Sequence, residues 1–232
     1  MNKKLTIVIP CKNEGENIIR VLKLLFRQKL DCLIVIADSS DDKVSIDLMH
    51  DFVRRTTKPV RIIKGGLPSV ARNNGAKFAR TPFVLFLDAD VFVIKESLIM
   101  DCLSIASQGH YDLVTCKFKT INNEYDWVYR IFDIIQWISS NKTPFAIGGF
   151  MLFRTSTFNN LGGFNEEDKI AEDYHLSSKI QPEKFRIVDS YVHTTPRRFK
   201  TKGIWYMIKL MWLSWRNKNN DDWFKQDYNY WD

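Results

Sequence analysis

The sequence predicts an α/β fold with a Rossmann-like, mostly parallel central sheet flanked by helices. In the first 95 residues, short β-branched or apolar runs alternate with amphipathic segments at intervals of about 25 residues, as in βαβ units. Apolar residues make up 45% of the 232-residue chain and charged residues 26%, so a mainly disordered protein is excluded. This length suffices for one domain with a full hydrophobic core.

Four strands and three helices are expected in this first half. Residues 5–10 (LTIVIP) form a β-branched run that ends at a proline, as a buried strand does. Residues 16–28 place their apolar side chains on one side of an amphipathic helix. The remaining elements are strands at 32–38, 60–64 and 81–90 and helices at 39–55 and 70–80. Ser and Asp residues at 39–42 suit a helix N-terminus.

The second half is less regular. A strand is expected near 112–118, a helix near 124–140 and a further strand-like run, IVDSYVH, that ends at His193. No internal repeat or low-complexity linker divides the chain. We therefore expect a domain at 1–200, with a nucleotide-binding half at 1–95, followed by a basic and aromatic segment at 201–232.

Charge and cysteine content limit the class of protein. A net charge of +7 indicates an anionic partner, without choosing among a nucleotide, a phospholipid surface and a nucleic acid. The four cysteines show neither a CxxC pair nor the spacing of the disulfide frameworks of secreted proteins, so we expect them to be reduced and buried. No run approaches the roughly 18 apolar residues of a membrane span. We expect a cytoplasmic protein that could lie on a membrane surface, on its cytoplasmic face, without crossing it.

The ends of the predicted strands indicate one ligand site. Doubly wound sheets bind ligands beyond the carboxyl ends of their strands. The residues at these ends are Pro10, Asp38, Gly65 and Asp88. Asp88 and Asp90, in the run LDAD, add two hard oxygen ligands of the kind that Mg²⁺ and Mn²⁺ prefer. Taken alone, the DxD pattern also fits a helix N-cap followed by a surface carboxylate.

Several short motifs of this chain, taken in the order in which they occur, resemble those of the family-2 glycosyltransferases, which have the GT-A fold. The resemblance runs from IVIPCKNE through VIADSSDD, GGLPSVARNNGAKFA and LDADV to GGFMLFR, LGGFNEE and AED, over roughly residues 5 to 200. It implies a UDP- or GDP-sugar donor, Mn²⁺ or Mg²⁺, and hexosyl transfer to the hydroxyl of a glycan or lipid-linked acceptor. Residues 96–200 would then be the acceptor-binding half.

The resemblance also implies which residues contact the donor. They are Pro10, Lys12 and Glu14 in the nucleotide pocket, Asp38 at the base, Arg72 at the base or phosphates, and Asp88 at the ribose with Ala89 beside it. The residues themselves suggest two further contacts: Gly149 would let the backbone approach the donor sugar closely, and a basic loop with Arg197 could close over the diphosphate, with a solvated basic turn as the alternative. Family members often carry two successive aspartates where this chain has Ala37-Asp38, which leaves the base open.

Catalytic and metal-binding roles follow from the same resemblance. Asp173 would be the general base that deprotonates the acceptor hydroxyl, and Glu172 would support acceptor binding. The alternative is a capping pair at a helix N-terminus. Asp90 and His193 would hold the metal, although a lone histidine is more often a packed or surface residue.

The C-terminal segment is basic and aromatic. Residues 197–218 contain seven Lys and Arg and no acid. Trp205, Ile208, Trp212 and Trp215 recur at helical spacing, which is typical of a helix on an anionic membrane surface. The alternative is a helix docked on the protein's own core.

Other functions remain open at this point. Inversion at the anomeric carbon is expected, with retention as the alternative. A nucleotidyltransferase would carry a glycine-rich basic loop after the first strand, where this chain has CKNEGEN. A nucleic-acid-binding module could use the basic aromatic segment, but the carboxylates at the strand ends would repel a polyanion, so we do not expect nucleic acid.

Overall fold

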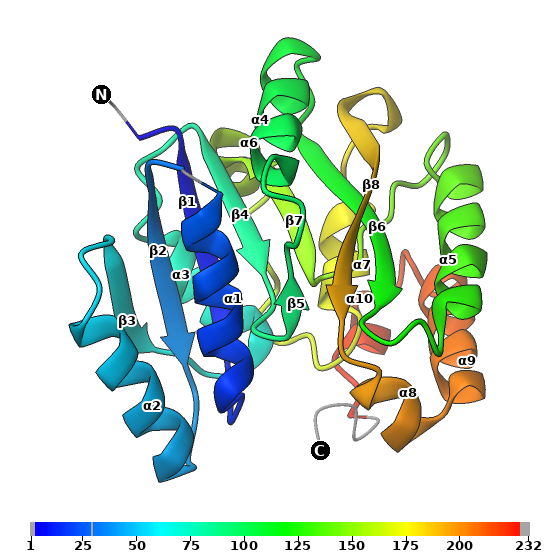
Figure 1. Cartoon of the computed structure of the whole chain (residues 1–232). Helices are drawn as coiled ribbons and strands as arrows, with labels where there is room; N and C mark the ends of the chain where they lie inside the picture. Colours follow the sequence, from blue (N-terminus) through cyan, green and yellow to red (C-terminus); the bar gives the residue numbers. More distant parts are fainter. Residues whose placement is uncertain (1–2, 29, 228–232) are drawn as a thin grey trace.

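Within residues 3–28 and 30–227, which a computed structural model of the chain describes, eight strands form one central sheet with helices on both faces (Figure 1). The strand order is β3-β2-β1-β4-β7-β6-β8-β5. The strands are β1 Leu5–Cys11, β2 Cys32–Asp38, β3 Val60–Lys64, β4 Phe83–Leu87, β5 Val91–Phe92, β6 Leu113–Thr120, β7 Phe150–Arg154 and β8 Phe185–Thr194. The helices are α1 Glu16–Arg27, α2 Lys43–Arg54, α3 Pro68–Ala76, α4 Leu98–Gln108, α5 Asp126–Ser139, α6 Thr155–Asn160, α7 Glu172–Ser177, α8 Arg197–Lys202, α9 Ile204–Arg216 and α10 Asp221–Phe224.

The first four strands form the parallel part of the sheet. β1 pairs in parallel with β2 and β4, and β2 pairs in parallel with β3. Ile7 and Ile9 of β1 belong to the core cluster that includes α1, while Val8 belongs to the cluster on the opposite face. Alternate side chains of a strand face opposite sides of a sheet, so a strand covered on both faces is apolar throughout.

The strand order reverses beside β1. β2 and β3 lie on one side of it, and β4 lies on the other. A crevice forms where the order of an open α/β sheet reverses, beyond the carboxyl ends of its strands. The ends of β1 and β4 therefore frame the place where a ligand is expected.

The second half is a mixed sheet. β7 runs antiparallel between β4 and β6, β6 and β8 are parallel, and β5 is antiparallel to β8. The predicted fold class, an α/β domain with a mostly parallel sheet flanked by helices, is confirmed. Its antiparallel pairings occur where the sequence pattern is less regular.

Several predicted elements have different ends in the structure. α2 begins at Lys43 and not at residue 39, because the carboxylate of Asp42 caps it by accepting two backbone N–H groups of its first turn. β4 ends at Leu87, which is opposite Phe150 and is the last residue paired with β7. α3 begins earlier than predicted, at Pro68, whose missing N–H suits a first helical position. α4, α6 and β5 were not predicted.

The C-terminal segment packs on the rest of the domain with one side. Leu210 of α9 lies in a cluster with Tyr174 of α7, and Phe224 of α10 stacks on His175 with ring centroids 4.3 Å apart. The predicted boundary between residues 200 and 201 falls inside α8. Over the described residues, every helix is too short or too polar to span a bilayer.

The four cysteines are free and buried, as expected. Burial raises the pKa of Cys11 and of Cys102 to about 12, because a thiolate is poorly solvated in an apolar core. These thiols therefore contribute to packing, and their protonated form is the stable one.

Candidate active site

The loop that follows β1 is held in place by Asn13. Its side-chain oxygen accepts the backbone N–H groups of Asp41 and Asp42, each at 3.1 Å, and its amide donates to the carboxylate of Asp41 at 2.6 Å. Asn13 has a φ of 53°, a conformation that asparagine tolerates better than most residues. The loop carrying Lys12 and Glu14 is thus fixed at the edge of the crevice.

Asp88, Ala89 and Asp90 form a turn directly after β4. The N–H of Asp88 donates to the carbonyl of Gly149 at 3.2 Å, and the N–H of Val91 donates to the carbonyl of Asp88 at 3.1 Å. Asp88 and Asp90 line both of the cavities described below. The turn therefore presents two carboxylates to the crevice from a fixed backbone.

Arg72 of α3 joins the two halves of the site. Its Nη1 donates to Oε1 of Glu172 at 2.6 Å and its Nη2 to Oδ1 of Asp88 at 2.7 Å, and its guanidinium lies over the ring of Phe164. Burial disfavours the charge of Arg72, but the two carboxylates outweigh it and raise the pKa of Arg72 above its ordinary value. Burial also raises the pKa of Glu172, against the lowering effect of Arg72.

Arg197, at the start of α8, contacts the carboxylates of Glu14 and Asp90 at the edge of the crevice. Its Nη2 donates to Oε1 of Glu14 at 2.6 Å and lies 3.7 Å from Oδ2 of Asp90. Half of its side chain remains exposed. Arg197 is therefore placed to exchange these carboxylates for an anionic ligand without leaving the site.

The carboxylate of Asp90 is hydrogen-bonded and has a raised pKa. Its Oδ2 accepts the hydroxyl of Thr195 at 2.7 Å. Burial raises the pKa of Asp90, and the charges of Asp88 and Glu14 raise it further, while Thr195 and Arg197 oppose the rise. An additional cation at this point would relieve the crowding of three carboxylates.

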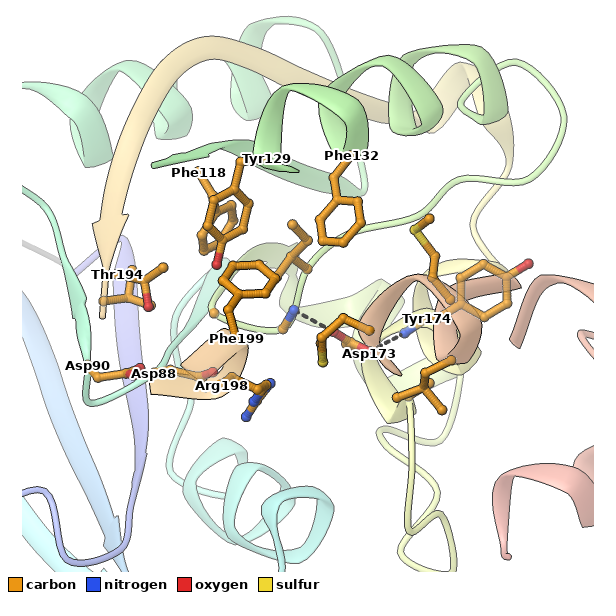
Figure 2. A pocket seen from close by; sticks show the side chains of 18 of the residues that line it. Asp88, Asp90, Phe118, Tyr129, Phe132, Asp173, Tyr174, Thr194, Arg198 and Phe199 are labelled. Carbon is orange, nitrogen blue, oxygen red and sulfur yellow. Dashed lines mark hydrogen bonds between the residues drawn. The ribbon is translucent and has the colours of Figure 1, made fainter. Parts of the chain in front are cut away.

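Asp173 is held at the start of α7. Its Oδ2 accepts the backbone N–H of Gly148 at 2.6 Å, and its Oδ1 accepts the N–H of Tyr174 at 2.7 Å; Figure 2 shows both bonds. Burial raises the pKa of Asp173, while Arg72 and these two N–H groups lower it in part. Ala171, which directly precedes Glu172 and Asp173, has a φ of 48°, a strained conformation for a residue with a Cβ.

Two cavities meet at these residues. The larger, which we call the sheet-edge cavity, has a volume of about 510 Å³ and is walled by the loops after β1, β2, β3 and β4. This volume lies within the range of small-molecule sites. Its lining includes Pro10, Lys12, Glu14, Ala89 and Ser39.

The smaller, which we call the inner cavity, has a volume of about 170 Å³ and contains Asp173. Its other walls are mostly apolar and come from β6, α5, the segment between α5 and β7, α8 and α9. These walls are Phe118, Tyr129, Phe132, Phe145, Ile147, Phe199, Met207, Leu210 and Met211. Figure 2 shows Asp88 and Asp90 at one end of this cavity, Tyr174 at the other and Asp173 between them, with aromatic rings alongside. Both cavities are lined by Arg72, Asp88, Asp90, Arg197 and Arg198.

Two predicted site residues lie outside both linings. Asp38 folds back on its own loop, where Oδ1 accepts the N–H and the hydroxyl of Ser40, as short polar side chains do at strand ends. His193 precedes Thr194, which lines the inner cavity. His193 itself is in neither lining.

The surroundings of His193 agree with this placement. Burial and the charge of Lys119 lower the pKa of His193, against a smaller opposite effect of Asp126. Its Nδ1 is buried without a hydrogen-bond partner. His193 thus lies outside both cavity linings, and its role as a metal ligand beside Asp90 stays a prediction.

Gly149 lies in the inner cavity, but a Cβ added there would lie 2.9 Å from the side chain of Val91. Packing of the sheet therefore already requires a glycine at this position, independently of any donor sugar. Gly148 is the closer neighbour of the site, since a Cβ on it would lie 3.1 Å from both Arg72 and Asp173.

Sequence reasoning missed Thr195 and the apolar lining of the inner cavity. Thr195 stands two residues before Arg197, so the polar run around it was a usable signal. The apolar residues come from four separate elements and the segment between α5 and β7, and they look like ordinary core residues in sequence. Only the packing of α5, α8 and α9 brings them together.

Comparison with known proteins gives a family match. The model for glycosyl transferase family 2 matches residues 6–162. A poly(ribitol-phosphate) beta-glucosyltransferase of Bacillus spizizenii is 25% identical over 203 residues, which cover 81% of this chain and 31% of that protein. The poly(ribitol-phosphate) beta-N-acetylglucosaminyltransferase TarP of Staphylococcus aureus is 26% identical over 185 residues, covering 74% of this chain and 55% of that protein.

Solved structures show the same fold. The mannosyltransferase PcManGT of Pyrobaculum calidifontis, in complex with GDP-Man and Mn²⁺, superposes with a TM-score of 0.71 at 15% identity, covering 93% of this chain and 65% of that one. Residues 1–349 of S. aureus TarS, in complex with UDP-GlcNAc, give a TM-score of 0.61 at 19% identity, covering 83% of this chain and 58% of that one. The chain spans about a third of the length of the first relative named above.

Proposed function

Because the chain belongs to glycosyl transferase family 2, we propose that it transfers a sugar from a nucleotide-sugar donor to the hydroxyl of an acceptor. One observation carries the proposal. The sheet-edge cavity and the inner cavity meet at Arg72, Asp88 and Asp90, and the inner cavity holds Asp173. A donor in the first cavity would thus present its sugar to a carboxylate in the second.

The donor's nucleotide belongs in the sheet-edge cavity. Its lining combines Pro10, Lys12 and Ser39 at the ends of β1 and β2 with Arg72 and Arg197. The two arginines supply fixed positive charge where a diphosphate would lie. GDP-Man and UDP-GlcNAc in the neighbouring structures support a nucleoside diphosphate sugar and leave the base of this chain's donor open.

A divalent metal fits the Asp90 turn. Asp90 and Asp88 offer hard oxygen ligands, and the pKa of Asp90 is raised by burial and, after it, by the nearby charges of Asp88 and Glu14. Mn²⁺ or Mg²⁺ bound there would neutralise charge on the diphosphate of the donor. Because His193 lines neither cavity, we do not include it among the ligands of this proposal.

Asp173 is the general base of the proposed reaction. Its carboxylate takes the proton of the acceptor hydroxyl, the acceptor oxygen bonds to the anomeric carbon, and the nucleoside diphosphate leaves with the electron pair of the broken bond. Arg72 and Arg197 are placed to stabilise the charge that develops on the leaving group. Glu172 orients Arg72 through their ion pair.

Inversion of configuration suits this arrangement. Asp173 lies apart from the Asp88–Asp90 turn within the inner cavity (Figure 2), so base and leaving group can approach the sugar from different sides. The relatives are named as beta-transferases, and a β-linked product formed from an α-linked donor requires inversion.

The acceptor enters the inner cavity. Its walls, such as Phe132, Phe199 and Met211, favour an acceptor that carries apolar surface beside its hydroxyl. Of a glycan and a lipid-linked acceptor, this lining favours the lipid-linked one. The relatives act on poly(ribitol-phosphate), so a polyol phosphate is the alternative to test.

A donor panel tests the proposal. UDP- and GDP-sugars are each added with Mn²⁺ to the purified protein, and thermal stabilisation and release of nucleoside diphosphate are measured. One nucleotide series should stabilise the protein, and slow donor hydrolysis should appear with that series alone. If neither series stabilises the protein or releases diphosphate, with or without metal, the proposed function is wrong.

A further inference from the structure

Exposed apolar side chains gather on two helices of this protein. Among the described residues, eight of the fourteen large hydrophobic side chains that are exposed belong to α5 and α9. They are Trp127, Ile131, Ile134, Trp137 and Ile138 on α5, and Trp205, Trp212 and Trp215 on α9. A cluster of this kind on a water-soluble surface indicates a contact with an apolar partner.

The exposed residues form a row along each helix. On α5, Trp127, Ile131, Ile134 and Ile138 follow one another at spacings of three or four residues, so they share one side of the helix. The opposite side is buried through Val128 and Phe132. The exposed row is therefore additional to the apolar surface that the fold itself requires.

The row on α9 borders the same helix pair. Trp205, Ile208, Trp212 and Trp215 repeat the three- and four-residue spacing. Ile208 packs in the cluster that contains Val128 and Phe132 of α5, which places this row beside α5. At the other end of the pair, Lys218 donates to Thr143 in the segment after α5. Figure 1 shows α5 and α9 together at one edge of the molecule.

The charges around the two rows are mostly positive. Residues 197–220 contain seven Lys and Arg and no acid, and Lys209 and Arg216 are exposed on α9 beside the tryptophans. α5 carries two acidic residues. Asp126 accepts two hydrogen bonds from Thr120, and Asp133 is half-buried.

From this arrangement we propose that the α5–α9 face, defined by the eight exposed residues above, docks on the surface of an anionic phospholipid bilayer. Tryptophans prefer the headgroup level of a bilayer, and isoleucines insert beside them. The surrounding lysines and arginines match the negative charge of the lipid headgroups. Charge complementarity thus favours a bilayer over a second copy of this chain, whose net charge is +7.

Docking by this face has a consequence for the site. Phe132 of α5 and Met207 and Met211 of α9 line the inner cavity, while the exposed rows lie on the outer sides of the same helices. The bilayer would therefore lie one helix diameter from the proposed acceptor cavity. The docking itself needs no turnover, so its test is independent of the proposed function.

Vesicle flotation tests the docking. The full chain is mixed with vesicles of phosphatidylcholine alone and of phosphatidylcholine with phosphatidylglycerol, at low salt. The protein should float with the anionic vesicles and not with the neutral ones. Trp205→Ser/Trp212→Ser and, separately, Ile134→Ser/Ile138→Ser should each weaken binding by about tenfold or more, since binding scales with buried apolar area.

Matched variants complete the experiment. Val44→Ser/Leu48→Ser removes two exposed apolar side chains from α2, remote from the α5–α9 face, and should bind as the wild type does. Lys209→Gln/Arg216→Gln should reduce the preference for anionic lipid. Thermal unfolding, and stabilisation by the nucleotide found in the donor panel, verify that each variant is folded.

Three results would overturn the proposal. The wild type could ignore anionic vesicles at low salt. The α2 variant could lose as much binding as the α5 and α9 variants. Light scattering could show a dimer that the Trp205→Ser/Trp212→Ser change dissociates, in which case the face serves a second copy of the chain.

Discussion

Arg72 and Glu172, a hundred residues apart in the chain, form a buried ion pair in which Nη1 of Arg72 donates to Oε1 of Glu172 at 2.6 Å. The pair connects α3 of the parallel half with α7 of the other half. It therefore couples the donor side of the site to the helix that carries Asp173.

Removal of one partner should destabilise the fold. Arg72→Met leaves the buried carboxylate of Glu172 and the partly exposed carboxylate of Asp88 without their cation, and the loss of a buried partner typically costs about 3 to 5 kcal/mol. Urea unfolding of the variant measures this. Arg54→Met, which removes an exposed ion pair with Asp51, is the control and should cost less than about 1 kcal/mol. Equal costs for the two variants would contradict the structural role of the buried pair.

Asp173→Asn should lower kcat by about 10² to 10⁴-fold, because the amide cannot accept the acceptor's proton. Donor binding should persist, since the amide oxygen can still accept the N–H of Gly148. Steady-state kinetics and nucleotide-induced stabilisation separate these two effects. Turnover at the wild-type rate would show that another group is the base.

The pH profile offers a second measurement on Asp173. Burial raises the pKa of Asp173, and the base must be ionised to act, so kcat/KM should fall on the acid side with a midpoint above the ordinary aspartate value of about 3.9. Arg198→Gln removes a positive charge that lowers this pKa, and should move the midpoint upward. If the midpoint moved downward instead, the group whose ionisation limits kcat/KM on the acid side would not be Asp173.

Asp90→Asn should raise the stability of the metal-free protein while it abolishes stabilisation by Mn²⁺ and nucleotide. The pKa of Asp90 is raised in the folded state, so ionisation of this group destabilises the fold progressively as the pH rises above about 3.9, and the asparagine removes that penalty. Thermal unfolding at pH 4 and at pH 7 checks the sign, because the variant's advantage should be larger at pH 7. His193→Ala should retain the response to Mn²⁺, and its loss would restore the predicted His193 ligand.

Arg197→Gln should weaken nucleotide binding by about ten- to a hundredfold, the range of one charge-assisted hydrogen bond. Its effect on stability should be smaller than that of Arg72→Met, because Arg197 is half-exposed beside the largely buried Glu14, whereas Arg72 and Glu172 are both buried. Lys200→Gln is a matched control on the same helix, because Lys200 pairs with Glu124 and lines neither cavity. Titration calorimetry with the nucleotide found in the donor panel compares the two. Equal affinities would remove Arg197 from the donor site.

Gly148→Ala should reduce turnover more than stability. The new Cβ would lie 3.1 Å from both Nη2 of Arg72 and Oδ2 of Asp173, so these two groups must shift by a few tenths of an ångström. A shift of this kind misplaces the base while most of the packing is kept. Kinetics and urea unfolding on the same preparation test the difference, and unchanged kinetics would show that the site tolerates the shift.

Much of the first half could be predicted from local sequence. The apolar runs of β1, β2 and β4 and the amphipathic pattern of α1 depend on burial against near neighbours, which residue spacing encodes. The motif order placed Glu14, Arg72, Asp88, Asp90, Asp173 and Arg197 in one site, and the structure brings these six residues together around two adjoining cavities.

The sequence by itself determined the α/β class, the strand ends that carry the carboxylates, and the basic aromatic character of the C-terminal segment. Only the tertiary structure decided that Asp38 turns back on Ser40, that His193 lies outside both cavity linings, and that α5 and α9 enclose an apolar cavity on one side and expose tryptophans on the other. The reason is physical. Strand and helix periodicity specify which residues share a face, whereas the neighbour that each face meets depends on contacts between segments far apart in the chain.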